Sequence, residues 1–140
     1  MGDTGIIPTL IGCQIELPGR LRARYPELER VQWRRGGLPV RVASWFLGHG
    51  SAAAITLWRT VFLAPSMPLG AELLLHEFRH VQQFEANVTF PLRYLWESVR
   101  RGYFANRYEV DAREYAARQL RRGGCRDEEQ EQAHSACDIT

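Results

Sequence analysis

Two histidines and a glutamate in one short segment have the spacing of a metal site. His76 and His80 are four residues apart, and Glu77 directly follows the first of them, which gives the pattern H-E-x-x-H. In an α-helix, residues four apart lie on the same face, so both imidazoles can reach one ion. Catalytic zinc binds neutral imidazole nitrogens and keeps one position open for water. We therefore predict that His76 and His80 bind Zn²⁺ and that Glu77 is the general base for zinc-bound water. The alternative is a surface helix with an accidental histidine pair.

A third protein ligand is expected from the segment that begins at Asn106. Glu109 is the candidate that we favour, and if it is the ligand, Ala112, one turn later, is small enough to let its helix approach the metal helix closely. Asp111 and Glu114 are the competing carboxylates in the same segment. Glu109 also has an alternative structural role in a capping box, with Asn106 as the N-cap residue.

The segments around these residues predict strands followed by helices. Val40–Ala43 and Ala53–Leu63 are rich in β-branched and aromatic residues, which is typical of a hairpin or of two neighbouring strands joined through Gly48-His49-Gly50. Residues 20–35 form a charged segment that allows only a short helix, broken at Pro26. We read His49 as a turn residue rather than a ligand.

Three helices are expected after the strands. The first runs from Leu69 to Glu85 and contains both histidines, the second from Pro91 to Arg101, and the third from Arg107 to Arg122. In the second helix, apolar residues recur at helical spacing: Leu92, Leu95, Trp96 and Val99. The predicted fold is α+β, with a small antiparallel β-sheet or hairpin packed on about three α-helices.

Length and composition limit the remaining possibilities. A chain of 140 residues suits one domain, which we place at residues 1–122, followed by a disordered acidic tail at 123–140 that starts at Gly123-Gly124. All 18 basic residues are arginine, and no basic stripe alternates with aromatic residues, which argues against nucleic-acid binding. The spacing of Cys125, His134 and Cys137 matches no zinc-finger pattern.

Location and partners follow from the same composition. The three cysteines are unclustered, and we see no signal peptide and no apolar segment of bilayer length. We expect a cytoplasmic protein, with export by a signal-independent route still open, and no membrane partner. A peptide or protein substrate is the expected partner.

The site segments also resemble known families. Ala53–Glu85 and Asn106–Tyr115 are similar to the gluzincin-like metallopeptidases and to a domain of unknown function, the extracellular contractile injection system (eCIS) core domain. The specific part is the string Leu-x-His-Glu-x-x-His-Val-x-Gln, which begins at Leu74. The gluzincin-like third-ligand signature, Glu-x-x-small followed by Asp or Asn, falls on Glu109 and Ala112, but Arg113 takes the last position. The group that would orient a ligand histidine from that position is therefore missing.

The resemblance implies a peptidase with a substrate cleft. The resemblance also implies a minimal zincin-like fold, in which the strand before the metal helix, here Ala53–Leu63, is the edge strand along the cleft and pairs with an extended substrate. Tyr103, Tyr108 and Tyr115 are the candidates for stabilising the oxyanion, and the sequence does not rank them. We predict zinc-dependent hydrolysis of a peptide bond; the alternative is a catalytically weak zinc-binding module with a regulatory, toxin-associated or secretion-system role.

Overall fold

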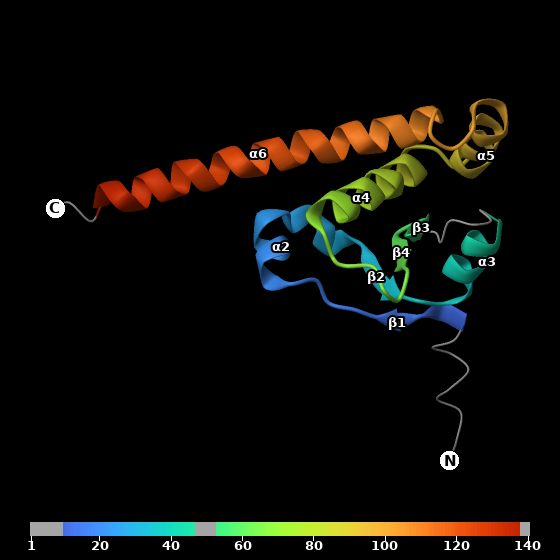
Figure 1. Cartoon of the computed structure of the whole chain (residues 1–140), viewed down its shortest axis with the longest axis horizontal. Coiled ribbons are helices and arrows are strands. Elements are labelled where there is room, and N and C mark those ends of the chain that lie inside the picture. Colours follow the sequence, from blue (N-terminus) through green and yellow to red (C-terminus); the bar gives the residue numbers. More distant parts are fainter. Residues whose placement is uncertain (1–9, 47–52, 138–140) are drawn as a thin grey trace, which may run out of the picture.

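The chain folds as an α+β structure, as expected. The structure, a computed structural model, describes residues 10–46 and 53–137, without the side chains of residues 43–46 and 125–137. Its strands are β1 (Cys13–Gln14), β2 (Gln32–Arg35), β3 (Ala54–Leu57) and β4 (Thr60–Leu63). Its helices are α2 (Gly19–Arg24), the 3-10 helix η1 (Pro26–Arg30), α3 (Leu38–Phe46), α4 (Ala71–Ala86), α5 (Phe90–Arg101) and α6 (Arg107–Cys137). Helix α4 lies between the sheet and α6 (Figure 1).

The sheet is mixed rather than purely antiparallel. Its strand order is β1-β2-β4-β3. The antiparallel hairpin of β3 and β4 lies entirely within Ala53–Leu63, so the expected hairpin between that segment and Val40–Ala43 is wrong. The expectation of an antiparallel sheet is wrong for β2, which runs parallel to β4 with Trp33 opposite Val61. Trp33 is buried and its indole Nε1 donates a hydrogen bond to the Leu28 carbonyl. Because Trp33 is followed by Arg34 and Arg35, the sequence does not alternate between apolar and polar residues here, and the strand was not predicted.

The segment Val40–Ala43 is helical, so the strand expected there is wrong. It lies within α3, where Val40 packs against Phe62 and Ala64. A segment this short and apolar does not distinguish a strand from a buried turn of helix by its pattern alone. The expected connection through Gly48-His49-Gly50, including His49, lies outside the described residues.

The main core lies where α4 covers the sheet. Leu74, Leu75, Phe78 and Val81 of α4 are buried against β-strand residues such as Val61. These positions repeat every three or four residues, which fixes one side of α4 to the sheet. The helix matches the predicted Leu69–Glu85 within two residues at its start and one at its end. Anchored in this way, α4 holds His76 and His80 in a rigid element.

Helix α6 continues through the glycine pair that we expected to end it. Gly123 is buried, and a Cβ atom added there would lie 2.7 Å from the Tyr25 hydroxyl oxygen and 2.8 Å from Arg24 Nε. Gly123 therefore allows α6 to pass close to Arg24, at the end of α2, and to Tyr25, and the helix does not end at this glycine. The domain boundary at residues 122 and 123 stays a prediction.

Helix α5 forms as predicted, but its apolar row points outward. Leu92, Leu95, Trp96 and Val99 are exposed, whereas Phe90 and Glu97 are buried. None of the helices that the structure describes is both long and apolar enough to cross a membrane.

Candidate metal centre

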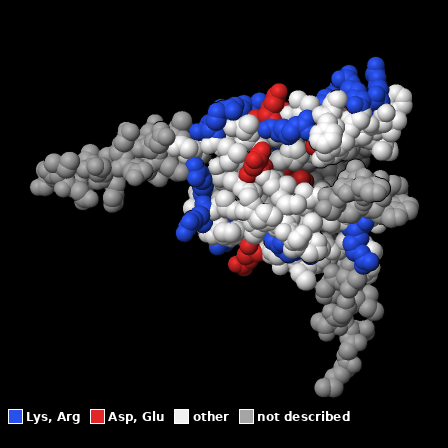
Figure 2. All heavy atoms as spheres, viewed as in Figure 1, with Lys and Arg blue, Asp and Glu red and all other residues white. Residues whose placement is uncertain are grey.

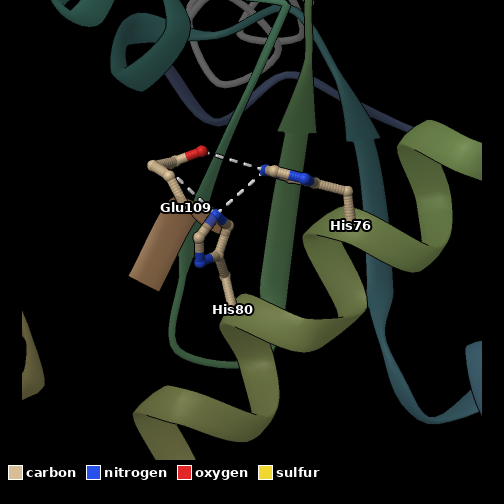
Figure 3. A group of neighbouring side chains, drawn as sticks. All are labelled: His76, His80 and Glu109. Carbon is tan, nitrogen blue, oxygen red and sulfur yellow. Dashed lines mark hydrogen bonds and ion pairs between the residues drawn. The ribbon is translucent and has the colours of Figure 1, made fainter. Parts of the chain in front are cut away.

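Two helices bring His76, His80 and Glu109 together. His76 and His80 extend from consecutive turns of α4, and Glu109 faces them from the first turn of α6 (Figure 3). The Nε2 atoms of the two histidines are 3.2 Å apart, and each lies 3.2 Å from an oxygen of Glu109. These three side chains form a group that could hold a metal ion.

The dimensions of this group suit zinc. Two ligand atoms, each about 2.05 Å from a tetrahedral zinc ion, are separated by about 3.3 Å. Three separations of 3.2 Å are close to that value: His76 Nε2 to Glu109 Oε2, His80 Nε2 to Glu109 Oε1, and one histidine Nε2 to the other. Two imidazoles and one carboxylate are also a known set of ligands for catalytic zinc. The residues present therefore fit this ion.

Glu109 is a buried carboxylate whose hydrogen bonding is incomplete. Its side chain is 2% exposed, and its Oε1 accepts a 2.6 Å hydrogen bond from the Tyr94 hydroxyl. Its Oε2 is buried without a well-directed hydrogen bond, although His76 Nε2 lies 3.2 Å away. Burial by itself raises the pKa of Glu109, but His76, His80 and Tyr94 outweigh it and hold the pKa well below its usual value. An ionised, incompletely paired buried oxygen is expected to attract a cation.

The neighbours of His80 favour the tautomer that a metal requires. Its Nδ1 lies 2.8 Å from Oε1 of Gln83, an atom that can only accept a hydrogen bond. The amide nitrogen of Gln83 donates to the Tyr108 carbonyl and to Asp111, which fixes the orientation of the amide. Nδ1 must therefore carry the proton, and in the neutral ring Nε2 has a lone pair directed at Glu109 and His76.

Gln83 thus orients His80, which is the role that the gluzincin-like signature gives to a group at the position of Arg113. Metal-bound histidines usually donate their second ring N–H to a nearby acceptor, and here that acceptor comes from α4 itself, three residues after His80. Asp111 supports Gln83 and also pairs with Arg79, at 2.7 Å between Asp111 Oδ2 and Arg79 Nε. Arg113 instead donates to the Phe104 carbonyl. Gln83 belongs to the string quoted above, but its role could not be read from spacing alone.

The structure separates the three candidate carboxylates for the third ligand. Only Glu109 joins the histidines; Asp111 pairs with Arg79, and the largely exposed Glu114 lies 3.6 Å from Arg118. Asn106 does cap α6, since its Oδ1 accepts a hydrogen bond from the Tyr108 backbone N–H. In a capping box, the Asn106 backbone N–H would donate to Glu109. Here it donates to the Tyr103 carbonyl, so the Glu109 side chain is left to face the histidines.

Glu77 is buried beside the site and is held by the sheet. Its Oε2 accepts a 2.6 Å hydrogen bond from the Thr56 hydroxyl on β3. Burial lowers the pKa of His80, but Glu109 and Glu77, with the Gln83 hydrogen bond, raise it overall. The two carboxylates therefore make this buried region negative, which favours a bound cation.

Two tyrosines lie close to Glu109. Tyr94, which was not among the candidates, contacts Glu109 directly. Tyr103 lies near the site, where burial, followed by the charge of Glu109, raises the pKa of its hydroxyl well above the usual value. The Tyr108 ring packs against Phe90, and the Tyr115 ring packs against Phe78. No spacing rule connects Tyr94 to Glu109, because the contact depends on how α5 crosses α6.

Comparison with known proteins identifies the family. The family model for the eCIS core domain matches residues 18–88, half of the chain, so the protein belongs to the eCIS core domain family. This range contains His76, Glu77, His80 and Gln83, whereas Glu109 lies beyond it. No curated protein and no solved structure gives a significant match. The side chains of Cys125, His134 and Cys137 lie outside the described residues.

Proposed function

We propose that this protein is a zinc-dependent, gluzincin-like peptidase. The observation that supports this most strongly is the group of His76, His80 and Glu109, with 3.2 Å between facing nitrogen and oxygen atoms and with Glu77 buried nearby. His76, His80 and Glu109 would hold the ion. Zinc in such a site lowers the pKa of a bound water and polarises a carbonyl oxygen.

In this proposal Glu77 moves the proton. Its carboxylate takes a proton from the attacking water and then gives it to the nitrogen of the leaving amine as the peptide C–N bond breaks. The Thr56 hydroxyl fixes Oε2 of Glu77, so we assign the proton transfer to Oε1. Gln83 keeps His80 oriented throughout, because its own amide is fixed by Tyr108 and Asp111.

The position of β3 supports a peptide substrate. Within the described sheet, β3 is an edge strand that pairs only with β4. An extended peptide can add to such an edge through main-chain hydrogen bonds. The hydrogen bond between Thr56 and Glu77 joins β3 to the metal helix, so a peptide on this edge would lie beside the general base.

A second candidate function is a zinc-binding module that acts through protein contacts, in a regulatory, toxin-associated or secretion-system role. The low exposure of the ligands favours it: the side chains of His76 and His80 are 16% and 9% exposed. A peptidase must admit a carbonyl group next to the metal, so this degree of burial requires either a narrow opening or a movement of the surrounding elements.

The substitution Glu77→Gln distinguishes the two functions. In the peptidase, zinc content stays at the wild-type level and hydrolysis falls by about 10²- to 10⁴-fold, because the general base is lost. Cleavage of a mixed peptide library, followed by mass spectrometry, measures this. Glu72→Gln, on the exposed first turn of the same helix, is the matched control and should cleave normally. Full turnover by Glu77→Gln would refute the mechanism, and a zinc-loaded wild type without turnover would favour the second function.

A further inference from the structure

Helix α5 is amphipathic, but its apolar side faces solvent and its more polar side faces the rest of the molecule. Its apolar residues at positions i, i+3, i+4 and i+7, from Leu92 to Val99, all face solvent, with Leu92 72% exposed and Trp96 65% exposed. Its inward side is the more polar one, since Tyr94 donates to Glu109 and Ser98 accepts a hydrogen bond from Asn106. The apolar row is therefore not used by the fold of the described residues.

Two further exposed apolar side chains lie in the segments on either side of α5. Val88, before α5, is 77% exposed, and Phe104, after it, is 81% exposed. We call these residues together the α5 face; it consists of Val88, Leu92, Leu95, Trp96, Val99 and Phe104. Helix α5 lies on the side of the molecule away from the C-terminal end of α6 (Figure 1).

The charges around the α5 face have one sign. Arg93 and Arg100 are exposed and, by helical geometry, border the apolar row on one side. The segment from Ala86 to Tyr108 contains four arginines and one acid, Glu97, which is 7% exposed and pairs with Arg101 at 3.3 Å. Basic side chains gather over α5 at the upper right of the molecule (Figure 2).

We propose that the α5 face binds an anionic lipid surface. A helix with Trp, Leu and Val on one side and arginines at the border lies in the plane of a membrane interface, with its apolar side among the acyl chains and its cations among the headgroups. An exposed row of this kind on one helix needs no shaped partner to cover it. A second copy of the chain fits less well, because two α5 faces would place like charges against each other.

This proposal differs from an expectation from the sequence. The lack of an apolar segment of bilayer length led us to expect no membrane partner, but a surface helix needs no such length. The outward direction of Leu92 and Trp96 became visible only in the structure. Because the inward side of α5 carries Tyr94, docking would place the metal centre one helix away from the lipid surface.

Vesicle cosedimentation of the full chain tests the proposal. Vesicles of phosphatidylcholine mixed with phosphatidylserine should bind the wild-type protein, and pure phosphatidylcholine vesicles should bind it much less. The double substitution Leu92→Ser/Trp96→Ser should weaken binding by about tenfold or more, because two large side chains no longer enter the bilayer. Arg93→Gln/Arg100→Gln should also weaken it, and added salt should do the same in the wild type.

The chain offers a matched control. Leu38 and Val42 of α3 are also exposed apolar residues four apart on a helix, so Leu38→Ser/Val42→Ser should bind vesicles as the wild type does. Absence of binding to anionic vesicles, equal loss in the α3 variant, or equal and salt-insensitive binding to both lipids would overturn the proposal. So would a wild-type dimer without vesicle binding that becomes monomeric in Leu92→Ser/Trp96→Ser. The test needs no bound metal, so its result is independent of the proposed hydrolysis.

Discussion

Replacing Gln83 tests how the protein prepares His80 for a metal. Gln83→Leu removes the acceptor 2.8 Å from His80 Nδ1 and both donations from the amide nitrogen, to Tyr108 and Asp111, while roughly preserving side-chain volume. The Nδ1 proton is then buried without a partner, and the ring can rotate or change tautomer. Loss of such an orienting contact lowers metal affinity by about 10- to 100-fold. We therefore expect the zinc dissociation constant of Gln83→Leu to rise by that factor.

Competition with a chromophoric chelator measures this change. Gln82→Leu is the matched control: Gln82 is the next residue of α4 and accepts a 2.8 Å hydrogen bond from Arg79 in the same network. That control should bind zinc within about threefold of the wild type, well below the range for a lost orienting contact. Wild-type affinity in Gln83→Leu, or an equal loss in Gln82→Leu, would show that the contact with His80 does not orient a ligand.

Two further predictions concern stability. Tyr94→Phe removes the 2.6 Å hydrogen bond to Glu109, so the free energy of unfolding in zinc-free buffer should fall by about 1.5–3 kcal/mol in a urea titration; an unchanged midpoint would contradict the strength given to this contact. Zinc at about 100 times its dissociation constant should stabilise the wild type by about 2.7 kcal/mol and raise the melting temperature by several degrees. The same zinc concentration should have no effect on His76→Ala, and an equal rise in that variant would place the binding elsewhere.

Features set by local spacing were predictable from the sequence. The i, i+4 relation of His76 and His80 required only that α4 be a helix, and the run of residues without proline after Gly70 indicated one. The β-branched and aromatic residues of Ala53–Leu63 also indicated strand structure, but the turn at Trp58 and Arg59 that folds this segment into a hairpin was not predicted. Ala112, one turn after Glu109, was small enough to let its helix approach the metal helix closely, and it is fully buried in the structure.

Features set by distant contacts were not predictable in the same way. Strand β2 depends on its parallel pairing with β4, whose sequence is almost 30 residues away, and its arginines resemble a surface segment. The helical spacing in α5 was clear, but spacing does not tell which side of a helix faces the core, and the apolar row proved to be exposed. Gly123 looked like a helix end and is instead a point of close approach to Tyr25.

Zinc content is the most direct test of the central claim, that His76, His80 and Glu109 form a metal site. Purified wild-type protein should contain about one zinc ion per chain, as expected for a single group of three protein ligands. His76→Ala and Glu109→Ala should lose it, while Glu114→Ala, a change in a largely exposed acid on the same helix as Glu109, should retain it. Wild-type protein without zinc after reconstitution, or full zinc content in Glu109→Ala, would contradict the account.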